Sequence, residues 1–111
     1  MRKWYRMDEI EGKVIVEGNL PKEMNYEKIS NVEDYDGSRC VVVNTLDPDL
    51  FLIFGKIDCI ISKRGSKLSH LAILAREYGK SIILAENEKI GDKGELSIAR
   101  EGDTAIMKLK S

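Results

Sequence analysis

The chain has 111 residues, of which 42% are hydrophobic and 33% are charged. This length fits one compact domain and excludes a multidomain enzyme, while the composition excludes a wholly disordered chain. The 18 basic and 19 acidic side chains leave a net charge of −1, so no overall field attracts nucleic acid or a membrane. We therefore expect residues 1–111 to form a single domain that binds neither.

Cysteine usage and the N-terminus indicate a reducing compartment. Cys40 and Cys59 lie in apolar runs and match no metal-binding or disulfide spacing, so they are expected to be reduced core residues. The first seven residues are followed at once by acidic side chains, which is unlike a secretory leader. No apolar stretch approaches the roughly 20 residues that span a bilayer. The prediction is a cytoplasmic protein.

The first half of the chain predicts two strands and a short helix. The alternating, β-branched stretch 12–17 predicts a strand. Residues 20–37 contain turn formers and show weak periodicity, so a loop or short helix is expected there. The continuous apolar run 39–45 predicts a strand that is covered on both faces. Asp47 then favours an N-cap, with proline at the first position of a short helix over 48–54.

The second half contains the clearest helix signal. After a polar, glycine-containing loop at residues 63–67, Ser69 can cap a helix over 70–78, and Gly79 occupies the position where helices stop. The remaining strands are predicted at 57–62, at 81–85, and in a hairpin formed by 95–99 and 104–109. Strands mixed with two or three short helices predict an α/β domain with a partly mixed sheet.

Basic side chains gather around the start of this predicted helix. Residues 56–80 contain six basic and two acidic side chains, although the chain as a whole is nearly neutral. A helix N-terminus presents free backbone N–H groups and a positive dipole end, and both favour a bound anion. The local charge and the helix start together predict an anion site, although for any one lysine taken alone an ordinary solvated surface is the better interpretation.

His70, the only histidine, lies at this helix start. A neutral imidazole nitrogen is a nucleophile that can accept a phosphoryl group. On spacing alone, a solitary histidine is more often a capping or surface residue. Metal binding has less support, because there is no second histidine and no carboxylate three or four residues further on. Serine-hydrolase chemistry fails because the GSKLS segment lacks the glycine that follows the nucleophile in GxSxG.

Residues 65–79, GSKLSHLAILAREYG, resemble the phosphohistidine motif of phosphoenolpyruvate-utilising enzymes, whose pattern is similar to GGxxSHxAIxARExGxP. This family includes phosphoenolpyruvate synthase, pyruvate phosphate dikinase and enzyme I of the sugar phosphotransferase system. The resemblance extends to the TLDP segment at 45–48 and to the strands at 89–109, about two thirds of the chain. It implies the family's mobile domain, a single swivelling β/β/α domain, here as a chain of its own.

The resemblance implies a role for each residue of the motif. His70 would become transiently phosphorylated, and Ser69 would cap the helix and donate to the phosphoryl oxygens. Backbone N–H groups from Gly65 onward would assist. Arg76, six residues beyond His70 and about 9 Å along a helix, is a supporting residue or only a charge favourable to the helix end. The phosphoryl-stabilising residues are therefore predicted to be Arg64, Gly65, Ser66, Lys67 and Ser69.

Three residues depart from the family pattern. Ser66 replaces the second glycine, Leu68 stands where several members have threonine, and Ser81 stands where proline is usual. Leu68 lacks the hydroxyl that regulation by threonine phosphorylation needs, so such regulation is not expected at that position.

The resemblance also implies what other polypeptides must supply. The expected function is a phosphocarrier of a split phosphoenolpyruvate-utilising phosphotransferase, which works with an ATP-grasp subunit, a phosphoenolpyruvate-binding barrel or both in trans. No cofactor or metal is expected on this chain alone, and Mg²⁺ is expected on the partner domains. The alternatives are a non-catalytic interaction or regulatory module and a domain that binds phosphorylated metabolites.

Overall fold

Seven strands close into a barrel in the computed structural model, which describes residues 8–110. Around the barrel the order is β1-β5-β4-β3-β2-β6-β7, with β7 returning to β1. The strands are β1 (Asp8–Val16), β2 (Glu23–Lys28), β3 (Cys40–Val43), β4 (Cys59–Ser62), β5 (Ser81–Leu84), β6 (Lys93–Glu101) and β7 (Thr104–Lys110).

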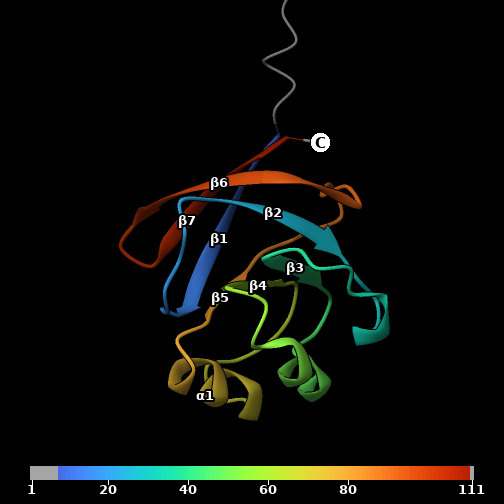
Figure 1. Ribbon diagram of the computed structural model, residues 1–111. Coiled ribbons are helices and arrows are strands. Elements are labelled where there is room, and N and C mark those ends of the chain that lie inside the picture. The colour runs from blue at the N-terminus through green and yellow to red at the C-terminus, as the bar shows by residue number, and fades with distance from the viewer. Residues whose placement is uncertain (1–7, 111) are drawn as a thin grey trace, which may run out of the picture.

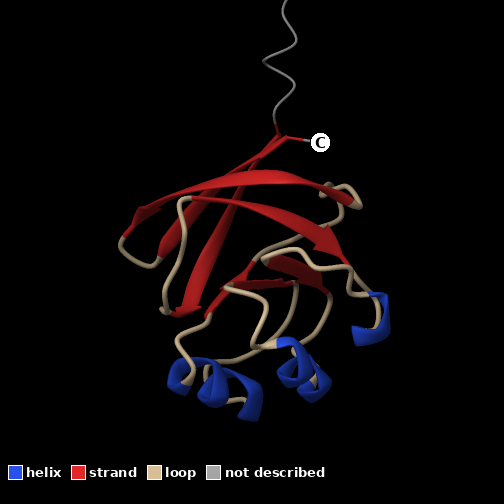
Figure 2. Cartoon of the chain, viewed as in Figure 1, coloured by secondary structure: helices blue, strands red, loops and turns tan. Residues whose placement is uncertain are grey.

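The four strands from β2 to β5 run parallel, and the other pairings are antiparallel. Parallel neighbours need crossover connections, and the helical segments lie in these connections. Two are 3₁₀ helices, η2 (Val32–Asp34) and η3 (Pro48–Ile53), and one is an α-helix, α1 (His70–Glu77). All three lie toward one end of the molecule (Figures 1 and 2).

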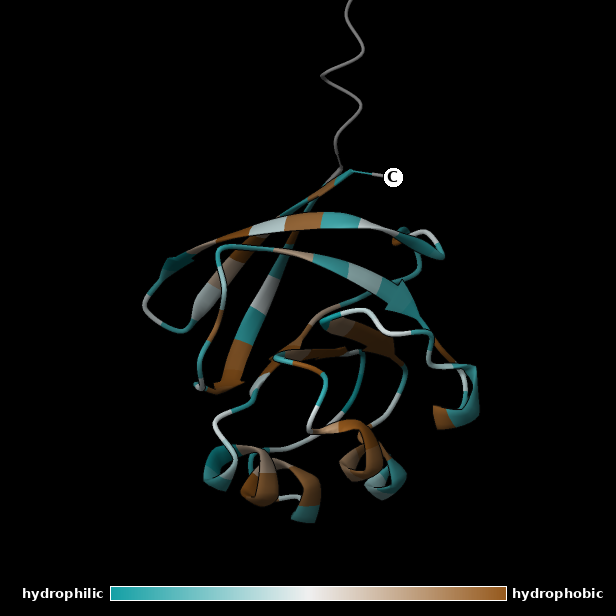
Figure 3. Ribbon diagram, viewed as in Figure 1, coloured by the Kyte–Doolittle hydropathy of each residue, from teal (hydrophilic) through white to brown (hydrophobic). Residues whose placement is uncertain are grey.

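The parallel strands separate two hydrophobic cores. Along β3, Cys40 and Val42 point into the barrel, whereas Val41 and Val43 point outward toward the helices. The outer core also includes Ile60 and Ile82 from the neighbouring strands. Both faces of these strands are buried, which explains their uninterrupted apolar sequences and confirms the prediction for residues 39–45. Figure 3 shows the same apolar colouring on β3 and β4 and on parts of the helices.

The predicted α/β fold was wrong. Strands dominate the described residues and close on themselves, and α1 is the only helix there with seven or more residues. The strand β2 was also missed, because residues 20–37 were expected to be a loop or short helix. In β2, buried Met24 and Tyr26 alternate with exposed Glu23 and Asn25, so its apolar signal is weak.

The two cysteines are buried and carry free thiols, as predicted. Cys40 and Cys59 are direct neighbours in the register of β3 and β4. A hydrogen bond with Cys59, followed by burial, raises the pKa of the Cys40 thiol well above its usual range. Because the thiolate is the reactive form, Cys40 has little reactivity in the folded chain.

We therefore expect slow alkylation of both thiols in the native protein and complete alkylation in denaturant. The alkylation rate of Cys40 in the native protein should not rise steeply as the pH passes the usual thiol range, because Cys40 stays protonated there. Thiol titration followed by mass spectrometry measures this. Rapid native alkylation, or a Cys40–Cys59 disulfide in freshly purified protein, would contradict the prediction.

The start of β1 lies beside the end of β7. These strands pair from Asp8 with Leu109 to Lys13 with Thr104, so both ends of the described chain leave the barrel at one place. Figure 1 shows that place at the end of the molecule remote from α1. Within residues 8–110, no helix has the length and apolar character needed to cross a membrane.

Candidate functional site at the start of α1

The helix α1 begins at His70, as predicted. Ser69 has extended backbone angles, and its hydroxyl accepts a hydrogen bond from the backbone N–H of Ala72 at 3.2 Å, which is an N-cap. At the other end, Gly79 has a positive φ of 73°, as a helix stop requires. The exposed His70 side chain has no hydrogen-bond partner among the described residues, so its ring is accessible.

The loop before α1 is held by its own hydrogen bonds and by the end of β3. The hydroxyl of Ser66 accepts from Leu68 N–H at 3.0 Å, and the carbonyl of Ser66 accepts from Ser69 N–H at 3.1 Å. Arg64 N–H donates to the carbonyl of Asn44 at 3.0 Å. These bonds bring the predicted residues Arg64 to His70 into one ordered turn.

Gly65 fits closely under Leu46. Its φ is +152°, and a Cβ added there would lie 2.4 Å from Leu46 Cδ1 and 2.8 Å from Leu46 Cγ. Only glycine combines that backbone conformation with such a close neighbour. The first glycine of the motif therefore lets the loop lie against Leu46, in the segment that follows β3.

Substitution of Gly65 by alanine should shift the loop and lower stability by about 1–3 kcal/mol, a typical cost of a strained backbone position. Denaturant unfolding measures the effect. Gly91→Ala is the matched control, because its added Cβ meets nothing within 4 Å. Equal unfolding midpoints for the two variants would show that the contact with Leu46 does not constrain the loop.

Four exposed residues at and before the start of α1 have backbone N–H groups without an acceptor. Within the described part of the chain no acceptor pairs with the N–H groups of Gly65, Ser66, Lys67 and His70. The N–H groups of Arg64, Leu68 and Ser69 are already used inside the loop. The free donors and the positive end of the α1 dipole favour negative charge beside His70.

The cations near the site fall into two groups. Lys63 pairs with Glu88 and lies 3.8 Å from Glu86, and the hydrogen bond to Glu88 raises the pKa of Lys63. By contrast, Arg64 and Lys67 are exposed and form no ion pair with any residue in 8–110. The positive charge available to an anion therefore comes from the loop itself.

Arg76 lies in the last turn of α1, away from His70. It is exposed and unpaired within the described residues, so its position favours the dipole interpretation over contact with a group on His70. The structure thus brings Arg64 through His70 together and leaves Arg76 at the opposite end of the helix.

The α1 surface divides into a packed face and an open face. Leu71, Ala72 and Ala75 are buried, and the two alanines allow close approach to the strands. The exposed large hydrophobic side chains of the described chain all lie on η3, α1 or the adjoining residues. They are Phe51, Leu52, Leu68, Ile73 and Tyr78. An exposed apolar group of this kind is typical of a docking surface.

Sequence reasoning missed the residues that support the loop from β3 and β5. The carbonyl of Val43 accepts from Lys63 N–H at 3.1 Å and from the side-chain amide of buried Asn87 at 2.8 Å. Asn44 and Leu46 contact the loop as described above. These contacts join segments that are far apart in the sequence, and no local sequence pattern predicts them. Within residues 8–110, no three His, Cys, Asp or Glu side chains gather as a metal site would require.

A barrel that presents an accessible histidine at a capped helix start, amid free N–H groups, defines a domain suited to holding an anionic group. Comparison with known families is more specific. The family model of the PEP-utilising enzyme mobile domain matches residues 36–108. The chain belongs to this family, as the motif at residues 65–79 predicted.

A curated relative agrees. Phosphoenolpyruvate synthase of Escherichia coli (strain K12) is 31% identical over a match that covers 87% of this chain. The match covers only 14% of the length of that enzyme. In that relative, a domain of this family is therefore a small part of a much longer protein and works together with other domains.

Proposed function

We propose that this chain is a phosphocarrier of a phosphoenolpyruvate-utilising phosphotransferase and that His70 is transiently phosphorylated. The observation that carries the proposal is the placement of an accessible imidazole at the N-terminus of α1, next to a loop whose exposed residues Gly65, Ser66 and Lys67 have unpaired backbone N–H groups. Family membership supports a role in phosphoryl transfer.

In the proposed step, a lone pair of an imidazole nitrogen forms an N–P bond as the P–O bond of the donor breaks. The bonding electrons leave with the oxygen of the donor. The free N–H groups from Gly65 to Lys67 and the charges of Arg64 and Lys67 stabilise the phosphoryl oxygens. Ser69 accepts a hydrogen bond from Ala72 but keeps its own hydroxyl proton, so it can also donate to the group.

The donor and acceptor sites belong to partners in this proposal. Phosphoryl transfer needs in-line positioning of both reactants and cationic stabilisation of the developing charge. An ATP-grasp domain or a phosphoenolpyruvate-binding barrel would supply these, with Mg²⁺ bound on the partner. The exposed apolar residues Leu52 on η3, Leu68 in the loop before α1 and Ile73 on α1 are suited to docking on such a partner.

The test is to purify the chain from its native cells under alkaline conditions, which preserve phosphohistidine. Mass spectrometry should show an adduct of about 80 Da, one phosphoryl group, on the peptide that contains His70, and brief acid treatment should remove it. In parallel, the isolated chain with ATP or phosphoenolpyruvate should show no turnover.

Two results would overturn the proposal. Absence of the adduct while the partner enzyme is active would indicate a non-catalytic interaction module. Sustained turnover of ATP or phosphoenolpyruvate by the isolated, contaminant-free chain would indicate a complete active site rather than a carrier.

A further inference from the structure

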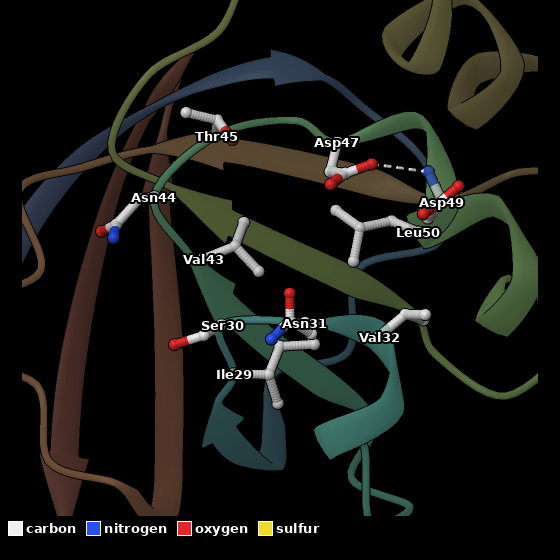
Figure 4. A pocket seen from close by; sticks show the side chains of 10 residues that line it. All are labelled: Ile29, Ser30, Asn31, Val32, Val43, Asn44, Thr45, Asp47, Asp49 and Leu50. Carbon is white, nitrogen blue, oxygen red and sulfur yellow. Dashed lines mark hydrogen bonds between the residues drawn. The ribbon is translucent and has the colours of Figure 1, made fainter.

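A cavity of about 220 Å³ lies beside the candidate site and is separate from it. It is formed where β2 and β3 end and where η2 and η3 begin (Figure 4). Because β2 and β3 are parallel, their carboxyl ends share one edge, and ligands bind at this edge in sheets of parallel strands. The volume is below that of pockets for drug-sized molecules, so it suits a smaller group.

The cavity has an apolar floor and an oxygen-rich rim. Buried Ile29, Val43 and Leu50 contribute to the floor. No lysine, arginine or histidine is among its lining residues, so an anion would find no positive partner there. The rim consists of Ser30, Asn31, Asn44, Thr45, Asp47 and Asp49.

The two rim carboxylates lack cationic partners in the part of the chain that the structure describes. Asp47 uses one oxygen, Oδ1, to accept from Asp49 N–H at 2.9 Å, and the side chain of Asp49 has no partner there. Figure 4 shows both rim carboxylates on the same side of the cavity, next to Leu50.

We propose that this cavity binds an alkylammonium or alkylguanidinium group. The alkyl stem covers the methyl groups of the floor, and the cationic end binds the carboxylates of Asp47 and Asp49. Such a group comes either from a small metabolite or from a lysine or arginine side chain of a protein partner. The site does not depend on phosphorylation of His70, although Asn44 on its rim also holds Arg64 through a backbone hydrogen bond.

The test is a titration of the ¹⁵N-labelled chain with n-butylammonium and n-propylguanidinium, followed by NMR. Backbone signals of the lining residues should shift and saturate with both cations. Butyrate and n-butanol, which have a similar apolar stem, should leave them unchanged. If neither cation gives saturable shifts, or if butyrate or butanol shifts the same signals equally, the proposal is wrong.

A double variant tests whether the two carboxylate charges bind the cation, while it keeps the cap of η3. Asp47→Asn with Asp49→Asn removes both charges, and asparagine at position 47 keeps the helix cap. We expect cation affinity to fall about tenfold, because exposed ion pairs contribute modestly. Glu33→Gln, an exposed charge change on η2 outside the cavity lining, is the matched control and should bind as the unmodified chain does. Equal affinity in the double variant and the control would overturn the assignment.

A peptide distinguishes the two sources of the cation. Tighter binding of acetyl-Leu-Arg-Leu-amide than of n-propylguanidinium at the same lining residues would indicate a side chain of a protein partner. Equal or weaker binding of the peptide, with saturable binding of the free cation, would indicate a small metabolite. Either result supports a cation site, because both require the carboxylates of Asp47 and Asp49.

Discussion

Replacement of His70 by alanine should abolish phosphorylation of the chain completely. No other histidine is present, and the free N–H groups at the start of α1 can stabilise a phosphoryl group but cannot accept it covalently. The measurement is the acid-labile adduct on chain purified from cells that express the variant. An undiminished adduct in His70→Ala would place the acceptor elsewhere.

The His70→Ala variant should fold as the unmodified chain does. His70 is exposed and has no hydrogen-bond partner within the described residues, so the variant should change the free energy of unfolding by no more than about 0.5 kcal/mol. Lys67→Gln provides a graded comparison, because it removes one loop charge and keeps the acceptor. It should slow labelling without abolishing it.

Replacement of Phe54 by alanine should lower the free energy of unfolding by about 3–5 kcal/mol, a large share of the total of about 5–15 kcal/mol for a domain. Phe54 is 3% exposed, and its ring makes edge contacts with Phe51 and Tyr78 at centroid distances of 5.2 and 6.2 Å. Its removal would leave a cavity between η3 and the end of α1. Denaturant unfolding measures the loss.

Leu52→Ala is the matched control for Phe54→Ala. Leu52 lies on η3, the 3₁₀ helix that Phe54 caps at its C-terminal end, but is 74% exposed, so its removal should change stability by less than about 0.5 kcal/mol. If docking uses the exposed apolar residues, Leu52→Ala should nevertheless slow phosphorylation of His70 in cells. Similar losses of stability in both variants would show that the aromatic contacts do not hold the helices together.

Local signals predicted the helix that carries the candidate site. The cap at Ser69, the helix start at His70 and the stop at Gly79 are each determined by residues within a few positions of one another, so the sequence pattern contains the whole cause. The family resemblance then suggested the chemistry that is proposed for His70, which the geometry alone leaves open. The roles of Ser66, Lys67 and Arg64 toward a phosphoryl group stay predictions.

The closed barrel could not be predicted in the same way. Its closure depends on β1 pairing with both β5 and β7 and on β2 pairing with β6, all contacts between distant segments. Alternation shows which face of a strand is buried, but not which strand lies beside it. β2 was harder still, because Glu27 is buried on the face opposite to Met24 and Tyr26, where it accepts hydrogen bonds from Asp36 and Ser38, so a charged residue occupies a buried position.

The pairing of the outer ends of β1 and β7 gives the domain a single point of attachment. A host protein joined through either end, or through both, holds the barrel by the same corner, so the domain can be inserted between two segments without long linkers. The start of α1 lies toward the far end of the barrel (Figure 1). A small rotation about this point would therefore displace the start of α1, where His70 lies, farther than it displaces the paired ends of β1 and β7.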